Sequence, residues 1–149
     1  MNVLLSIKPK YVKSIIEGEK RYEFRKTIFK NREIDQIYIY SSSPVKKIVG
    51  TFEIGGILED HPVDLWDNVK EYAGINNHDF FSYFEGKSRA FAIKIQNLQE
   101  FNDPIDPYET MPGFVPPQSY CYMDGEKCPA APPHDTSNAT KTMLHHRLR

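Results

Sequence analysis

The sequence has little cysteine and no long hydrophobic run. Its 149 residues include only two cysteines, Cys121 and Cys128, too few for the disulfide framework of a small secreted domain, so we expect a reducing, cytoplasmic environment. No apolar stretch approaches the roughly 18 residues that a membrane-spanning helix needs. Residues 1–7 lack the basic start and the length of a signal peptide, and we expect no contact with a membrane.

The motifs of the common catalytic and metal-binding classes are also missing. The sequence contains no Gly-x-Ser-x-Gly motif and no glycine loop that would cradle a phosphate. The side chains to consider for zinc are those of Cys121, Cys128, His134, His145 and His146, and their spacing matches no common zinc module. We therefore predict no metal site and no cofactor.

Charge is close to balanced overall, at −1, but it is unevenly distributed along the chain. Residues 1–50 contain eleven Lys and Arg against five Asp and Glu, whereas residues 51–124 contain four against thirteen. These counts exclude a uniformly basic nucleic-acid-binding surface. Two interpretations remain: one positively charged face built by the first third of the chain, or an ordinary solvated surface.

The spacing of apolar residues predicts strands with inserted helices. A short strand, 3–7, precedes a helix that begins at Pro9 and ends at Gly18. Further strands are expected at 36–40, 47–58 and 89–98, with bends at Gly50 and Gly55-Gly56, and further helices at 64–72 and 78–84. The prolines that begin with Pro104 predict an extended segment that cannot be a central strand.

This order of elements predicts one domain of the α+β class over residues 1–123. The expected architecture is a small mixed β-barrel with two or three peripheral helices. Residues 124–149 are rich in Pro, Ser, Thr and His and contain few large apolar residues, a composition that predicts a disordered tail.

The charged stretch Gly18-Glu19-Lys20-Arg21-Tyr22-Glu23-Phe24-Arg25 is the strongest functional signal. Alternate residues of a strand share a face, so Glu23 and Arg25 are expected on one side, with Lys20 in the preceding turn. Three interpretations of these residues are open: a surface ion-pair cluster, a buried network that orients the strand, and a ligand site formed by a carboxylate and two cations.

The pattern Gly-x-Lys-x-x-Glu-x-Arg resembles the signature of the ASCH (activating signal cointegrator homology) family, a branch of the PUA-like β-barrels. The resemblance extends through Leu5-Ser6-Ile7-Lys8-Pro9, Ile39-Tyr40-Ser41-Ser42-Ser43-Pro44 and Phe114-Val115-Pro116-Pro117-Gln118-Ser119-Tyr120, and covers residues 1–123. It implies a PUA-like fold, and it places Lys20, Glu23 and Arg25 in the family's ligand pocket.

The residues that we predict to line this pocket carry cations, hydroxyls or amides. Lys8 occupies a helix N-cap position, where a cation opposes the helix dipole but suits a phosphate. Glu23 can accept from the exocyclic amine of a base, Arg25 can bind phosphate or stack on a base, and Gln118 can bond a base edge. The complete predicted set is Lys8, Lys20, Glu23, Arg25, Tyr40, Ser41, Ser42, Gln118 and Ser119.

Three hypotheses for function follow. The first is a domain that binds RNA or a modified nucleotide. The second is a small hydrolase with Lys20 and Glu23 as its catalytic pair, acting on RNA or, as the resemblance to bacterial amidohydrolases implies, on N4-acetylcytidine; Glu23 stands where those enzymes have threonine. The third is a transcription-related adaptor with a protein partner.

Overall fold

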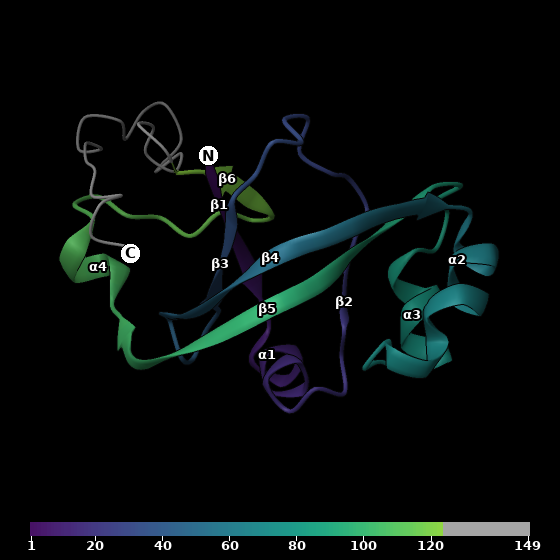
Figure 1. Ribbon diagram of the computed structural model, residues 1–149, viewed down its shortest axis with the longest axis horizontal. Coiled ribbons are helices and arrows are strands. Elements are labelled where there is room, and N and C mark those ends of the chain that lie inside the picture. Colours follow the sequence, from purple (N-terminus) through teal and green to yellow (C-terminus); the bar gives the residue numbers. More distant parts are fainter. Residues whose placement is uncertain (124–149) are drawn as a thin grey trace.

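The computed structural model describes residues 1–123, and one mixed sheet dominates them (Figure 1). The predicted tail at 124–149, with Cys128 and the three histidines of the zinc set, lies outside the described residues. The strands are β1 (Asn2–Ile7), β2 (Tyr22–Arg25), β3 (Gln36–Ser41), β4 (Lys47–Asp60), β5 (Ala90–Ile105) and β6 (Tyr120–Tyr122). Their order across the sheet is β2-β5-β4-β3-β1-β6, with β1 parallel to β3 and the other neighbours antiparallel.

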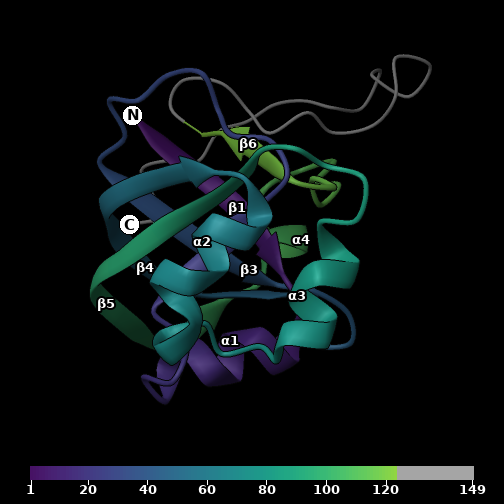
Figure 2. The same cartoon turned by 90° about the vertical axis from the view of Figure 1, so that its right-hand side faces the viewer.

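The helices lie at the margins of this sheet. They are α1 (Pro9–Ile16), α2 (Pro62–Val69), the 3-10 turn η1 (Lys70–Tyr72), α3 (Asn77–Tyr83) and the single-turn α4 (Pro107–Thr110). Figure 2 shows α2 and α3 next to each other at the end of the long β4–β5 ribbon. The predicted α+β class is confirmed, and the small mixed β-barrel that we predicted takes the form of a curled, six-stranded half-barrel sheet. No helix within residues 1–123 is long and apolar enough to cross a membrane.

The long strands β4 and β5 curl the sheet. They pair from Ile48↔Ile105 to Asp60↔Ala90, with register shifts at Ile48/Gly50, Thr51/Glu53 and Ile54/Gly56. Each shift bends the ribbon and increases its twist. The predicted bends at Gly50 and Gly55-Gly56 are confirmed, and Gly50 is required for close approach, because an added Cβ would overlap the backbone oxygen of Gln99.

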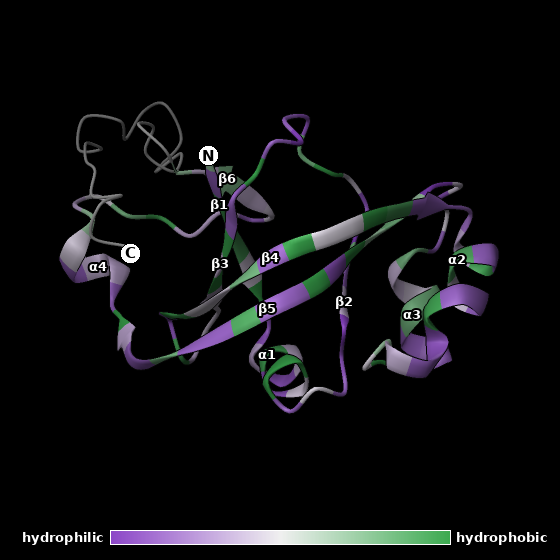
Figure 3. Cartoon of the chain, viewed as in Figure 1, coloured by the Kyte–Doolittle hydropathy of each residue, from purple (hydrophilic) through white to green (hydrophobic). Residues whose placement is uncertain are grey.

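The extended segment predicted from the prolines is observed at Pro104, whereas Pro107 begins the single-turn helix α4 and that part of the prediction is wrong. Pro104 lies inside β5, which continues to Ile105 and there pairs with Ile48 of β4. A proline is tolerated at this position because β2 covers the other edge of β5 only from Phe91 to Lys94, so the far end of the strand has a single partner. Figure 3 shows hydrophilic residues along the same part of β5, in keeping with its exposed far half.

Three groups of buried side chains hold the layers together. The first packs the strands β1 and β3 against α1, through residues such as Leu5, Ile39 and Ile15. The second surrounds Tyr40 and Phe114, on the side of α4. The third lies beneath α2 and α3 and includes Phe24 of β2, so the strand that carries Glu23 and Arg25 is fixed by this group.

Substitution of Phe80 by alanine should test that third group. Phe80 is fully buried, with its ring centroid 5.1 Å from that of Phe24, 4.8 Å from Trp66 and 5.0 Å from Phe84. We expect Phe80→Ala to lower the free energy of unfolding by about 3–5 kcal/mol, as measured by urea denaturation. Val63→Ala, at a side chain 54% exposed on α2, is the control and should cost less than about 0.5 kcal/mol. A loss below about 1 kcal/mol for Phe80→Ala would contradict the packing described.

Candidate functional site

Lys20, Glu23 and Arg25 form a buried ion network on and beside β2. Their exposed fractions are 3%, 7% and 8%, so of the three interpretations the surface ion-pair cluster is excluded and a buried network is observed. Arg25 Nη2 lies 3.0 Å from Glu23 Oε2, and Lys20 Nζ lies 4.0 Å from Glu23 Oε1. The alternation expected of a strand therefore holds, with one carboxylate between two cations.

Arg25 also connects β2 to distant parts of the chain. Its Nη2 donates to the backbone oxygen of Ser6 at 2.8 Å, and its Nη1 to the hydroxyl and backbone oxygen of Ser119 at 3.4 and 3.5 Å. Its Nε is buried and has no hydrogen-bond partner among the described residues. The guanidinium of Arg25, on the edge strand β2, is therefore hydrogen-bonded to the end of β1 and to the residue that precedes β6.

Lys20 lies in an apolar recess. Its ammonium is 4.3 Å from the ring centroid of Phe24 and 5.3 Å from that of Tyr11, and it donates to the backbone oxygen of Ala73 at 3.2 Å. Burial lowers the pKa of Lys20 to about 8, although Glu23 opposes this shift, and the positive charge of Arg25 adds to it. Near neutral pH, Lys20 can therefore exchange a proton more readily than an exposed lysine.

These three residues line a cleft of about 530 Å³ between β2, the start of α1 and α3. We call it the charged cleft. Lys8 and Lys10 contribute further cations, Tyr11 and Tyr83 contribute rings, and Asp79 contributes a second carboxylate. Arrangements of this kind suit a planar, polar ligand that carries or adjoins an anion.

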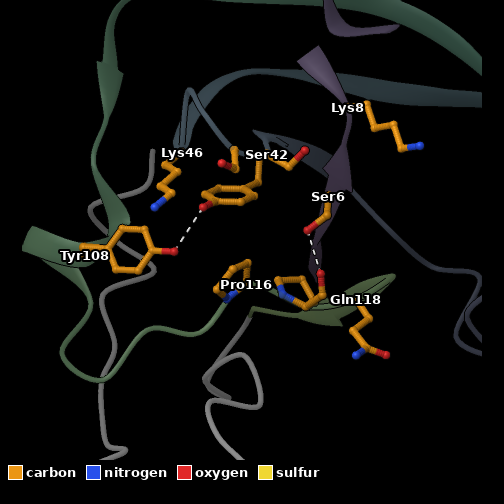
Figure 4. A pocket seen from close by; sticks show the side chains of 10 residues that line it. Ser6, Lys8, Ser42, Lys46, Tyr108, Pro116 and Gln118 are labelled. Carbon is orange, nitrogen blue, oxygen red and sulfur yellow. Dashed lines mark hydrogen bonds between the residues drawn. The ribbon is translucent and has the colours of Figure 1, made fainter. Parts of the chain in front are cut away.

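A second pocket, of about 410 Å³, adjoins the first and shares Ser6, Lys8 and Gln118 with it. We call it the hydroxyl pocket because Tyr40, Tyr108, Ser42 and Ser43 line it together with Lys46. The hydroxyls of Tyr40 and Tyr108 lie 3.2 Å apart, and Figure 4 shows the Lys46 side chain pointing toward this pair, with Lys8 and Gln118 at the other end. Burial raises the pKa of Tyr40, and the hydrogen bond with Tyr108 adds to that effect.

Lys46 has an unusual backbone. Its φ is +57°, in the left-handed region that residues other than glycine seldom adopt. Such conformations cost free energy and concentrate at functional sites. The turn after β3 thus directs a cation toward the tyrosine pair.

The structure divides the predicted residues between the two pockets. Lys20, Glu23 and Arg25 line the charged cleft, Tyr40 and Ser42 line the hydroxyl pocket, and Lys8 and Gln118 line both. Ser41 is 2% exposed, lies inside β3 and lines neither pocket. Ser119 also lines neither, and instead bonds Arg25.

The start of α1 differs in detail from the expectation. Lys8 is the N-cap residue and makes no side-chain capping bond, as predicted. However, the backbone N–H groups of Tyr11 and Val12 donate to the Lys8 carbonyl, so they are not free to bind an anion. The anion-binding role predicted for this position therefore depends on the side-chain ammonium of Lys8.

Sequence reasoning missed several residues of the two pockets. Lys46 follows a Ser-Pro turn and carried a weak signal, because lysines after a turn are common on surfaces. Tyr108 comes from α4, which is far along the chain from Tyr40, and no local pattern connects them. Tyr83 of α3 lines the charged cleft although it is far along the chain from β2, so no local pattern indicates it either. Within residues 1–123, no group of three or more His, Cys, Asp and Glu side chains is placed to hold a metal ion.

Comparison with known proteins settles the family. The model of the ASCH domain matches residues 5–105, well over half of the chain. The chain belongs to the ASCH domain family. This ASCH domain is 29% identical over 130 residues to the ASCH domain-containing ribonuclease of Zymomonas mobilis. The matched region covers 83% of this chain and 85% of that protein. It is 26% identical over 105 residues to the large ribosomal subunit protein uL22 of Ureaplasma parvum, covering 70% of the chain and 33% of that protein.

The solved structures agree with this assignment. The crystal structure of the Zymomonas mobilis ASCH protein superposes with a TM-score of 0.76 at 29% identity, over 82% of this chain and 87% of the other. Two further structures of that protein, one with a tyrosine replaced by phenylalanine and one with a serine replaced by alanine, give TM-scores of 0.76 and 0.75. The curled, mixed sheet with few helices is the ASCH and PUA-like α+β fold.

The lowered pKa of Lys20 has a consequence for stability. Because the folded-state pKa of Lys20, about 8, lies below the ordinary lysine value of 10.5, the unfolded chain holds this proton more tightly. The free energy of unfolding should therefore rise between about pH 8 and pH 10.5, by roughly 3 kcal/mol from this group.

Lys20→Met keeps the apolar stem and removes the titrating amine. We expect this variant to lack the rise, so that the difference between its unfolding free energy and that of the parent chain changes across this pH range in urea titrations. Lys13→Met, at an exposed lysine of α1, should retain the rise. Parallel pH profiles for Lys20→Met and the parent chain would contradict the environment described for Lys20.

Proposed function

We propose that this ASCH domain binds single-stranded RNA across the charged cleft and the hydroxyl pocket. The observation that carries the proposal is the continuity of the two pockets through Ser6, Lys8 and Gln118. Single-stranded nucleic acids are bound by grooves that combine cations for the phosphates with aromatic rings for the bases. Both kinds of group are present here in adjoining pockets.

In this proposal, some of the residues that line the pockets bind the RNA backbone and others bind its bases. Lys8 and Lys46 stand at opposite ends of the hydroxyl pocket, where they suit successive phosphates (Figure 4). Tyr83 and Tyr108 are 38% and 46% exposed, so each pocket has a ring on which a base can stack. RNA is preferred to DNA in this proposal because the Zymomonas mobilis relative is named a ribonuclease.

Removal of the pocket cations should weaken RNA binding in a salt-dependent way. We expect Lys8→Ala and Lys46→Ala each to lower the affinity for a fluorescent eight-nucleotide RNA, and to reduce the slope of log affinity against log salt by roughly 0.7 per lysine, as measured by anisotropy. Lys87→Ala, at an exposed lysine that lines neither pocket, is the control and should bind as the parent chain does. Unchanged slopes for both pocket variants would contradict the proposed path of the RNA.

Cleavage of the bound RNA is a second candidate function, favoured by the hydroxyl pocket. In transesterification the 2′-hydroxyl loses its proton to solvent water while its oxygen forms a bond to phosphorus, the bond from phosphorus to the 5′-oxygen breaks, and the 5′-oxygen takes up a proton. The Tyr40 hydroxyl is protonated near neutral pH and can donate a proton, and the Lys46 ammonium points toward the same pair of hydroxyls (Figure 4). The relative named a ribonuclease, 29% identical over most of its length, supports this reaction.

Tyr40→Phe separates cleavage from binding. Loss of the hydroxyl should slow cleavage of end-labelled RNA by roughly 10²–10⁴-fold, because general acid catalysis contributes about that much, while affinity changes little since the ring remains. Tyr108→Phe is the matched variant, and we expect a smaller effect because it removes only the partner of the Tyr40 hydroxyl. Cleavage by Tyr40→Phe at the parent rate would exclude Tyr40 as the proton donor.

The other two hypotheses receive less support. For hydrolysis of N4-acetylcytidine, the position of the threonine is held by Glu23, whose carboxylate forms an ion pair with Arg25. Lys20 and Glu23 nevertheless lie together in the charged cleft, and release of acetate from this nucleoside remains a prediction to be measured. The adaptor hypothesis likewise stays a prediction.

A further inference from the structure

We infer that the charged cleft selects guanine, so that this domain holds RNA with a guanine base in the cleft and the adjoining backbone in the hydroxyl pocket. The inference rests on the proposed RNA binding and adds base specificity to it. It is carried by buried hydrogen-bonding groups of the cleft that the protein leaves incompletely satisfied.

The first of these groups are donors. Lys20 Nζ has three N–H groups, of which one donates to the Ala73 carbonyl at 3.2 Å, while Glu23 is at 4.0 Å, beyond hydrogen-bond distance. Arg25 Nε has no partner among the described residues. Lys20 and Arg25 are 3% and 8% exposed. Buried N–H groups without an acceptor are costly, so a ligand that brings an acceptor to the Lys20 ammonium is favoured here.

The second group is the acceptor. The Glu23 carboxylate offers about four lone-pair sites. One oxygen is engaged by Arg25 at 3.0 Å, and the other has Lys20 at 4.0 Å, so both oxygens retain acceptor capacity. The cleft thus offers an acceptor pair beside cationic donors, within one network of three side chains.

The four bases differ in how well they complement this set. Guanine has two adjacent donors, N1–H and the N2 amine, which match the two carboxylate oxygens, and next to them O6, an acceptor for a cation. Adenine and cytosine each place an amine beside a ring nitrogen that is an acceptor, so a lone pair would face the second carboxylate oxygen. Uracil has a single N–H between two carbonyls. Guanine therefore satisfies the most groups of the cleft.

The walls of the cleft suit the flat faces of a base. Tyr11 and Tyr83 both line it, and Tyr83 is 38% exposed. Lys8 and Gln118, which line both pockets, stand where the sugar and phosphate attached to the base would pass into the hydroxyl pocket. Base selection and contact with the adjacent phosphate would therefore occur at neighbouring positions of the same strand.

The first test uses the unmodified protein and needs no variant. Competition of the four 5′-mononucleotides and inosine 5′-monophosphate against labelled RNA should rank guanosine monophosphate first, by roughly tenfold or more over the adenine, cytosine and uracil nucleotides. Inosine keeps N1–H and O6 but lacks the amine, and should fall between guanine and the others. Equal affinities, or a preference for another base, would overturn the inference.

The second test compares eight-uridine RNAs that carry one central guanine, adenine or cytosine. We expect the guanine-containing strand to bind most tightly to the parent chain, and Glu23→Gln to reduce this preference to within about threefold, because an amide has only one acceptor oxygen. Glu85→Gln, at an exposed carboxylate that lines neither pocket, should keep the preference. Circular dichroism checks the fold of Glu23→Gln, and if that variant is unfolded the nucleotide competition still decides.

The results separate this inference from the proposed function. If all the RNAs bind in a salt-dependent manner with equal affinity, the domain binds RNA and the guanine assignment is wrong. If neither RNA nor any mononucleotide binds, both are wrong. A guanine preference that persists unchanged in folded Glu23→Gln would also overturn the role assigned to the carboxylate.

Discussion

The hydrogen bonds of Arg25 hold the two margins of the sheet together. The order of strands places β2 at one edge, with three strands between it and β1, yet the guanidinium donates to the Ser6 carbonyl at the end of β1 and to Ser119 just before β6. The planar fork of an arginine can make these contacts at once, whereas a lysine could not. A buried guanidinium in turn needs a counter-ion, and Glu23 supplies it at 3.0 Å. The curl of the sheet and the position of the charged cleft therefore depend on the same side chain.

Local pattern predicted much of this arrangement. Alternation along the strand placed Glu23 with Arg25, the proline and glycine at its ends delimited α1, and glycines marked the bends of β4. These features were accessible because each depends on neighbouring residues or on the period of one element. The motif itself indicated the family, which the match over residues 5–105 establishes.

What the sequence did not reveal depends on long-range contacts. The hydroxyl of Tyr108 contacts that of Tyr40 because the fold places α4, which follows β5, beside β3. No spacing in the sequence predicts this contact. Ser41 follows Tyr40 in the chain, but alternation turns it away from the pocket and buries it. Pro104 obeys the rule that excludes proline from strands with two partners, because this end of β5 has one partner. The charge pattern agrees with the position of the two pockets, since the basic residues that line them, Lys8, Lys10, Lys20, Arg25 and Lys46, all come from the first 50 residues.

The segment from α2 to α3 has a consequence for how this fold can diversify. It is an excursion between the ends of β4 and β5, and it contributes Ile75, Asp79, Ser82 and Tyr83 to one side of the charged cleft. The opposite side, with Lys20, Glu23 and Arg25, belongs to the strand β2 and the turn before it. One side of the cleft is therefore fixed by the closure of the sheet, while the other is a replaceable loop of helices joined to a hairpin. Exchange of that loop offers a route to new ligands in which the curled sheet, and the charges that join its two margins, stay as they are.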